Sequence, residues 1–205
     1  MRLEINAEHP EPRKIAKAVE VLKDDGVIAY PTDTVYGLGC DFTSKKAVER
    51  IYQMKRMKPD QPLAFICADL GEIAKYGIVS NHTYRTMKRL TPGPYCFILE
   101  ATREAPRLMH MDARKGGKRK TVGIRVPNHP VAQALVTALG GPIVSSTCSK
   151  DGETLNDPAD IAEAYPGVDL ILDAGYGGLV PSTILDVSGA DIVVIREGAG
   201  AVDTL

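Results

Sequence analysis

The chain has 205 residues, 44% of them hydrophobic, which is enough for one domain with a sizeable core. No apolar run approaches the roughly 20 residues of a membrane helix, and residues 1–14 lack the apolar stretch of a secretory signal. The four cysteines are widely spaced and form no CxxC pair, which excludes the common zinc and thioredoxin motifs. We therefore expect one soluble, cytoplasmic, reduced domain over residues 1–205, with buried thiols and no membrane partner.

The net charge of −1 conceals an asymmetry along the chain. Residues 1–150 hold 24 of the 25 Lys and Arg against 15 Asp and Glu, a balance of +9. Residues 151–205 hold one Arg against 11 acids, a balance of −10. Uneven solvated surface would explain this pattern, and so would a basic face that binds an anion.

Helical and strand-like segments alternate along the chain and predict a mixed sheet flanked by helices. Apolar residues at helical spacing, with cap residues before them, predict helices at residues 11–24, after Ser44, after Asp69, at 81–90, at 130–139 and after Asp157. Short apolar runs predict strands at residues 27–30, 63–67, 95–101, 121–126, 142–146, 168–173, 182–187 and 191–196. The last two strands, joined by SGAD, are expected to form a hairpin.

The stretch YPTDTVYGLGC, residues 30–40, follows a predicted strand with two threonines around an acid. Thr32 and Thr34, at the carboxyl end of a strand, would be well placed to face a ligand in an open sheet. The alternative is a turn in which the acid and the threonines bond to their own backbone. Gly37 and Gly39 are expected to allow tight backbone turns.

The stretch MKRMKPDQPL, residues 54–63, places Lys55, Arg56 and Lys58 within four positions, ahead of an apolar run. Three cations before a strand could hold a polyphosphate, contact an RNA backbone or keep a loop soluble. The chain has neither the GxxxxGK[ST] phosphate loop nor the GxGxxG fingerprint. A nucleotide would therefore be bound without either device.

The stretch ARKGGKRKTVGIRVP, residues 113–127, combines a basic loop with a strand. Strand alternation places Arg125 on the face shared with Thr121 and Gly123, where an arginine usually meets a carboxylate or phosphate. A solvated surface loop is the simpler explanation of the preceding cations, and RNA binding is the alternative. These cations are Arg114, Lys115, Lys118, Arg119 and Lys120.

Further hydroxyl groups and one arginine lie at strand boundaries, in SSTCSKDGE at 145–153, VPSTILDV at 180–187 and IREGAG at 195–200. Each stretch alone is ordinary loop chemistry, but together they could donate several hydrogen bonds to an anion. The histidines have no HxxxH or HExxH spacing, and His129 is expected to help start a helix. No serine lies in a GxSxG elbow, so a hydrolase with a covalent intermediate is not favoured.

Four stretches together resemble the YrdC-like family, in the family's order and at suitable spacing: YPTDTVYGLGC, TPGPYCFIL, TVGIRVPNHPVAQAL, and PSTILDV with VIREGAG. The resemblance runs from about residue 12 to about residue 200. It implies a single α/β domain, a twisted mixed sheet flanked by helices, with a concave basic surface. It also implies synthesis of threonylcarbamoyl-adenylate for tRNA modification, from L-threonine, bicarbonate and ATP with Mg²⁺.

In that reaction the threonine amine becomes a carbamate whose oxygen attacks the α-phosphorus of ATP, and pyrophosphate leaves. Such a transfer depends on positioning and charge neutralisation, so we assign no catalytic nucleophile, base or metal ligand. The resemblance implies a threonine site of Thr32, Thr34, Arg125, Ser145 and Ser182, with Arg125 gripping the carboxylate. It implies a nucleotide site of Lys55, Arg56, Lys58, Gln61, Thr121, Thr147, Ser149 and Arg196.

Two family signatures are altered in this chain. The arginine of K-x-R-P is replaced by Met57 and its proline by Lys58, while S-x-N-x-S-G aligns with TCSKDG. Loss of one charge-assisted contact costs about 1.5–3 kcal/mol, and we expect Arg56 or Lys58 to supply the missing charge. These departures resemble the YciO branch of the family.

Two functions are therefore considered. The first is a threonylcarbamoyl-adenylate synthase-like enzyme, a nucleotidyltransferase, favoured by five retained residues: Thr34, Thr121, Arg125, Ser182 and Arg196. The second is a YciO-type module that binds double-stranded RNA or tRNA, with weak or no synthase activity. Met57 and the altered second signature favour this alternative.

Overall fold

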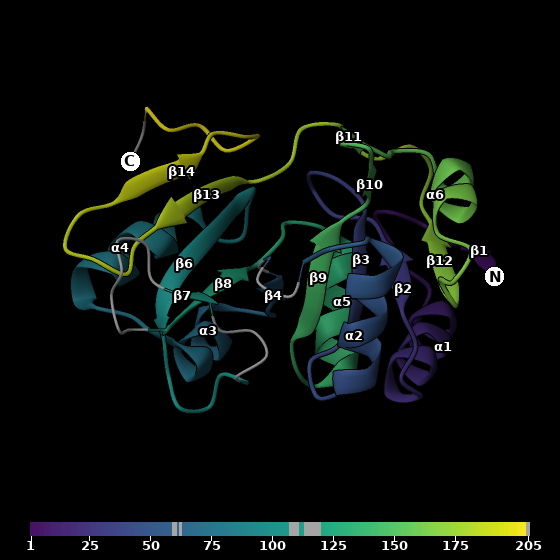
Figure 1. The fold of residues 1–205 in the computed structure, drawn as a ribbon, viewed down its shortest axis with the longest axis horizontal. Coiled ribbons are helices and arrows are strands. Elements are labelled where there is room, and N and C mark those ends of the chain that lie inside the picture. Colours follow the sequence, from purple (N-terminus) through teal and green to yellow (C-terminus); the bar gives the residue numbers. More distant parts are fainter. Residues whose placement is uncertain (59–60, 62, 107–110, 113–119, 204–205) are drawn as a thin grey trace.

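Within the described residues, 1–58, 61, 63–106, 111–112 and 120–203 of a computed structural model, twelve strands form one mixed sheet (Figure 1). Their order is β1-β12-β2-β3-β9-β4-β8-β6-β13-β14, with β5 beside β6 and β7 beside β8; β10 and β11 pair separately. The strands are β1 (Arg2–Glu4), β2 (Ile28–Tyr30), β3 (Gly37–Asp41), β4 (Ala64–Ile66), β5 (Gly77–Ile78), β6 (Tyr95–Ala101), β7 (Met111–Asp112), β8 (Lys120–Arg125), β9 (Ile143–Thr147), β10 (Ser149–Lys150), β11 (Glu153–Thr154), β12 (Leu170–Asp173), β13 (Thr183–Asp186) and β14 (Val193–Arg196).

The helices begin where the cap residues of the sequence predict them. Ser44 accepts a hydrogen bond from the backbone N–H of Ala47, and Asp69, His129 and Asp157 cap their helices in the same way. The helices are α1 (Pro12–Lys23), α2 (Lys45–Met54), α3 (Leu70–Tyr76), α4 (Asn81–Leu90), α5 (Pro130–Leu139) and α6 (Pro158–Ala164). The expected mixed α/β architecture is confirmed, and so is the hairpin of β13 and β14.

The sequence missed a strand in the centre of the sheet. Gly37 and Gly39 do not form turns; they lie in β3, paired with β2 on one side and β9 on the other. A Cβ on Gly37 would lie 2.8 Å from Ser145 Oγ, and one on Gly39 would lie 2.7 Å from the Tyr30 ring. Glycine is needed here because neighbouring side chains occupy that space, not because the backbone turns.

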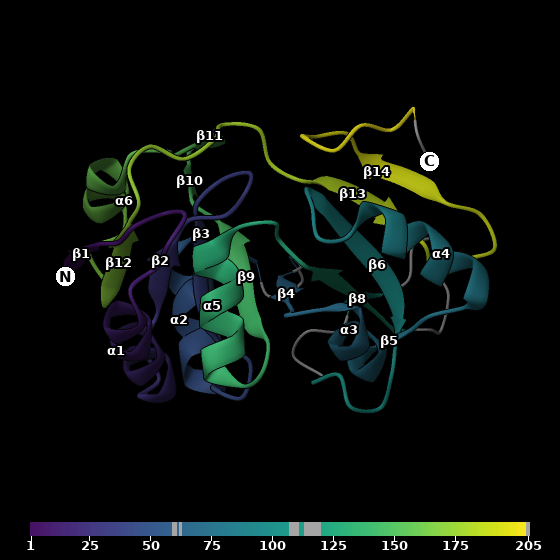
Figure 2. The same ribbon diagram turned by 180° about the vertical axis from the view of Figure 1, so that it is seen from behind.

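Alternate residues of the strands divide the interior into two clusters. On β2, Ile28 and Tyr30 pack with α1 and α5, whereas Ala29 packs with α2 on the other face. Figures 1 and 2 show α2 and α5 on opposite faces of the half of the sheet that contains β2, β3 and β9. Both faces of this half are therefore covered by helices.

The other half of the sheet, built from β4, β8, β6, β13 and β14, differs. On one face, alternate residues such as Phe65, Ile124 and Phe97 pack with side chains of α3 and α4. The residues between them point to the opposite face, and there they line a pocket. The arrangement of the helices thus determines on which face a ligand could bind.

Two further expectations concern the described part of the chain. All four cysteines are free and buried, and burial is what the sequence predicts for them. Among the described residues, none of the helices has the length and the apolar character that crossing a membrane requires.

Candidate functional site

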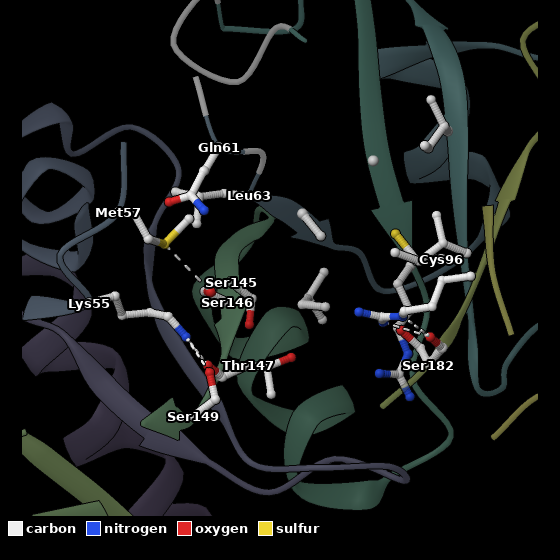
Figure 3. Close-up of a pocket in the computed structure, with 17 residues that line it drawn as sticks. Lys55, Met57, Gln61, Leu63, Cys96, Ser145, Ser146, Thr147, Ser149 and Ser182 are labelled. Atoms are coloured by element: carbon white, nitrogen blue, oxygen red, sulfur yellow. Dashed lines mark hydrogen bonds between the residues drawn. The ribbon is translucent and has the colours of Figure 1, made fainter. Parts of the chain in front are cut away.

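A cavity of about 420 Å³ lies between the two halves of the sheet (Figure 3). Alternate residues of neighbouring strands form the floor of the cavity. Strand pairing places these residues side by side: Ala64 beside Gly123, Ile66 beside Arg125 and Ile184 beside Cys96. Its opposite wall comes from the segment after α2 and from β9. The side chains that the argument uses are Lys55, Met57, Cys96, Arg125, Ser145, Ser146, Thr147, Ser149, Ser182 and Arg196.

The cavity brings together most of the positions that the sequence predicted as site residues. From the threonine set, Arg125, Ser145 and Ser182 line it. From the nucleotide set it contains Lys55, Gln61, Thr147, Ser149 and Arg196. Residues from both sets and from both halves of the sheet therefore border one cavity.

The buried Arg125 guanidinium is held by three protein acceptors. Nη1 donates to Thr34 Oγ1 at 2.8 Å, Nη2 to Asp33 Oδ1 at 2.5 Å, and Nε to the Gly93 carbonyl at 3.3 Å. The side chains of the Arg125–Asp33 ion pair are only 7% and 13% exposed. Such a pair is well shielded from solvent, so its electrostatic interaction is only weakly screened.

Thr32 and Thr34 do not line the cavity. Thr34 accepts a hydrogen bond from Arg125, and Thr32 accepts one from the amide of Thr34. The Thr32 hydroxyl donates to the Val35 carbonyl at 2.6 Å, so in the 3.2 Å contact between the two hydroxyls Thr34 is the donor. Thr34 Oγ1 in turn accepts from Arg125, so its single O–H donor and one of its two acceptor lone pairs are used. The turn bonds to its own backbone, as the second alternative predicts, and it also positions a residue of the cavity; that the two threonines face a ligand stays a prediction.

Lys55 crosses to the end of β9. Its ammonium donates to the Thr147 carbonyl and to Ser149 Oγ, the latter at 3.2 Å. Burial lowers the pKa of Lys55 from its usual value. The two hydrogen bonds hold the Lys55 ammonium on the wall opposite Arg125, next to the hydroxyls of the TCS stretch (Figure 3).

Arg196 lies at the same end of the cavity as Arg125. Its Nη2 and Nε donate to the Ser182 carbonyl at 2.7 and 3.3 Å. Burial lowers the pKa of Arg196, and the nearby Arg125 contributes to the same effect. Cys96 lies near both arginines, and burial raises the pKa of its thiol to about 11, so it is a neutral lining group rather than a nucleophile.

The expected substitutes for the missing signature arginine are not in the cavity. Arg56 has φ of 50°, a left-handed residue just after α2, and its side chain is exposed, as is that of Lys58. Met57 turns inward instead, with its amide bonded to the Tyr52 carbonyl. Neither side chain lines the cavity, so the hypothesis that Arg56 or Lys58 supplies the missing charge stays a prediction.

The remaining predicted positions lie elsewhere. Thr121 is buried in β8 without lining the cavity, and Lys120 is exposed at the start of the same strand. The loop cations Arg114, Lys115, Lys118 and Arg119 lie outside the described residues. The RNA-binding hypothesis for that loop therefore receives no structural test.

Sequence reasoning missed several members of the site. Ser146 Oγ donates to the Met57 thioether at 3.9 Å, and Asp33 forms the counter-ion of Arg125. The signal for Asp33 was its position between two threonines at a strand end, but only the fold brings it to Arg125, 92 residues away. The aliphatic part of the floor, which includes Ile98 and Ile184, had no signal beyond strand periodicity.

Residues 20–198 match the family model described as telomere recombination, which carries the names Sua5, YciO and YrdC. The chain is 42% identical over 201 residues to the uncharacterised protein YciO of Escherichia coli K12, covering 97% of this chain and 95% of that protein. The crystal structure of E. coli YciO has a TM-score of 0.92 with this chain at 41% identity, covering 98% and 97% of the two chains.

Two further relatives carry names that describe chemistry. A threonylcarbamoyl-AMP synthase of Halorhodospira halophila is 33% identical over 179 residues, covering 85% of this chain and 91% of the synthase. The crystal structure of P. abyssi Sua5 complexed with L-threonine has a TM-score of 0.89 at 27% identity; the match covers all of this chain and 59% of that one. The chain belongs to the Sua5/YciO/YrdC family.

Proposed function

We propose that this protein is an L-threonylcarbamoyladenylate synthase-like enzyme that forms threonylcarbamoyl-AMP, pyrophosphate and water from L-threonine, bicarbonate and ATP. The observation that carries the proposal is the single cavity in which Lys55, Arg125 and Arg196 converge with the hydroxyls of β9 and Ser182. The names of the synthase relatives and of Sua5 with L-threonine support this choice of substrates.

The charges suggest an orientation for the substrates. The two arginines would receive the amino-acid carboxylate at one end, and Lys55 with Thr147 and Ser149 would receive phosphate oxygens at the other. Bicarbonate and the threonine amine would then meet between them, where the carbamate oxygen can approach the α-phosphorus. The protein would contribute alignment and charge neutralisation rather than a covalent intermediate.

Magnesium would enter as part of the nucleotide substrate. The described lining of the cavity contains no carboxylate, and no group of three potential metal ligands occurs in the described part of the chain. Phosphate oxygens and water supply most ligands of Mg²⁺ in nucleotide sites, so a Mg–ATP complex needs little more from the protein than hydroxyls. Thr147 and Ser149 carry such hydroxyls beside Lys55.

The test is synthesis of threonylcarbamoyl-AMP from ATP, Mg²⁺, L-threonine and labelled bicarbonate. We expect labelled product with the unaltered protein and a ten- to hundredfold lower rate with Lys55→Gln, about the loss of one charged hydrogen bond. The matched control is Arg50→Gln, which removes a cation that pairs with Asp169 outside the cavity and should leave the rate unchanged. No labelled product from the unaltered protein would refute the proposal.

The alternative, a module for double-stranded RNA or tRNA with weak synthase activity, is favoured by one observation. A thioether lies where the family signature has a cation, so the wall beside Lys55 is less suited to a triphosphate. RNA affinity that falls steeply with salt, in a protein that makes no labelled product, would support this alternative. A flat salt response would argue against it.

A further inference from the structure

The backbone of Ser149 needs hydrogen-bond partners from outside its own hairpin. Next to the paired strands β10 and β11, the Leu155 amide donates to the Cys148 carbonyl at 2.9 Å. Pairs that exchange backbone hydrogen bonds alternate with pairs that do not, so the next pair, Ser149 and Thr154, exchanges none. The N–H and C=O groups of Ser149 therefore point away from the hairpin. Each needs another partner, because an unpaired backbone group inside a protein is costly.

A single tyrosine hydroxyl bonds to both of these groups. Tyr165 Oη donates to the Ser149 carbonyl and accepts from the Ser149 amide, the latter at 3.2 Å. A phenolic hydroxyl has one donor and can also accept, which is what one C=O and one N–H group require. Burial raises the pKa of Tyr165, so the hydroxyl keeps its proton at neutral pH. The tyrosine is 5% exposed and is not part of the cavity lining.

Tyr165 is itself fixed at the end of α6. Its amide donates to the Ile161 carbonyl at 2.9 Å, and its carbonyl accepts from the Val168 amide at 3.0 Å. Its side chain belongs to the same buried hydrophobic cluster as these two residues. The position of the hydroxyl is therefore set by the core, and Ser149 is held against it.

Ser149 in turn helps to hold Lys55. The Lys55 ammonium donates to Ser149 Oγ at 3.2 Å and to the Thr147 carbonyl (Figure 3). Both acceptors are neutral, and no carboxylate of the described residues forms an ion pair with Lys55. The charge of Lys55 is therefore available to an anion in the cavity, and its direction depends on where Ser149 lies.

We propose that Tyr165 is a positioning residue for anion binding: by bonding to both backbone groups of Ser149, it places the hydroxyl that orients the Lys55 ammonium. The inference rests on the proposed function for the identity of the anion, a polyphosphate. Tyr165 itself lies outside the cavity lining and acts through Ser149. Without the phenolic oxygen, the two backbone groups of Ser149 need new partners, and Ser149 Oγ leaves its place beside Lys55.

Calorimetric titration with two probes, Mg–ATP and inorganic pyrophosphate, tests this inference without requiring synthesis. Tyr165→Phe keeps the ring and should weaken the binding of both probes about five- to tenfold, because a charge-assisted hydrogen bond from Lys55 depends on its geometry. Ser149→Ala should cause a loss of similar size, since it removes the last link of the same chain of contacts. In protein that carries Lys55→Gln, neither change should weaken binding further, because residues that act through one contact are not additive.

Tyr36→Phe is the matched control. The Tyr36 hydroxyl also bonds to two backbone groups outside the cavity lining, donating to the Gly175 carbonyl at 2.8 Å and accepting from the Ala174 amide at 3.0 Å. Both tyrosine variants should lower stability, but only Tyr165→Phe should change the affinity for the two probes. In the synthesis assay, Tyr165→Phe should raise the KM for ATP and leave the KM for L-threonine unchanged, a split that general damage to the fold would not produce.

Unchanged affinity of Tyr165→Phe for both probes would overturn the inference, and so would a further loss when Tyr165→Phe is added to Lys55→Gln. Equal losses in Tyr36→Phe and Tyr165→Phe would overturn it too, as would the absence of binding by the unaltered protein. If Tyr165→Phe does not fold, Ser149→Ala decides, since unchanged affinity there breaks the link to Lys55.

The two proposals of this article fail separately. If the titration pattern holds and no labelled adenylate is formed, only the proposed function fails. If labelled product is formed without the pattern, only this inference fails.

Discussion

Met57 changes the chemistry of one wall of the cavity. Its thioether lies beside Lys55 and accepts a hydrogen bond from Ser146 Oγ at 3.9 Å, whereas the cations directly before and after it in sequence are exposed. Lys55 lines the cavity, whereas Lys58 lies exposed and outside it. Among the described lining residues, Lys55 is therefore the cation of this wall, and the affinity for a polyphosphate depends on it.

Replacing Met57 with arginine should strengthen ATP binding. A guanidinium at this position could form one charge-assisted contact with a phosphate, about 1.5–3 kcal/mol, which lowers the Kd for Mg–ATP roughly ten- to hundredfold. The measurement is a calorimetric titration with Mg–ATP, and Met57→Leu is the control of similar size without charge. Equal affinity of the two variants would show that phosphates do not approach this wall.

At the scale of elements, helix α5, which follows the cavity strand β8, begins with a cap residue that can titrate. His129 Nδ1 accepts a hydrogen bond from the Val131 amide at 3.2 Å, and the helix follows directly after β8, the strand that carries Arg125. Burial lowers the pKa of His129 below its ordinary value, although the nearby Asp33 opposes this shift. The folded state thus favours the neutral imidazole, whose Nδ1 lone pair is free to cap the helix.

This preference predicts how stability depends on pH. Because the folded-state pKa is lowered, the stabilising contribution is complete above the unfolded pKa of about 6.5 and is lost as the pH falls through the folded-state value. Urea unfolding between pH 7.5 and pH 5 should show this loss, and His129→Asn, which retains a capping oxygen but does not titrate, should reduce it. Identical pH profiles for both proteins would exclude His129 as the source.

At the scale of the whole molecule, the cavity joins two unlike halves of one sheet. One half has helices on both faces (Figures 1 and 2). The other half leaves a face for the cavity, which Arg125 and Arg196 line. Lys55 approaches from the helix-covered half. A ligand that contacts both groups of cations must span the two halves of the sheet. Its binding free energy therefore stabilises both halves together against unfolding.

Ligand binding should therefore raise the melting temperature in one transition. At a concentration 100 times its Kd, Mg–ATP adds about 2.7 kcal/mol, which corresponds to a shift of roughly 5–10 °C for a chain of this size. Scanning calorimetry measures this, and Lys55→Gln should shift much less at the same concentration. Two separate transitions, of which only one responds to Mg–ATP, would contradict a bridging ligand.

Much of the fold was encoded in local sequence signals. The caps at Ser44, Asp69 and His129 lie where predicted, since a cap depends only on residues within one turn of the helix. Alternation along β8 correctly directed Arg125 away from the core, because the period of a strand is a local property. These features required no knowledge of distant residues.

Only the tertiary structure decided the rest. Gly37 and Gly39 look like turn residues in sequence, but the side chains of Tyr30 and Ser145 make them strand residues. The balance of charge on Arg125 is set by Asp33, which the fold brings from 92 residues away in the sequence. Contacts between residues that lie far apart in the chain depend on how the strands are ordered, and that order has no local signature.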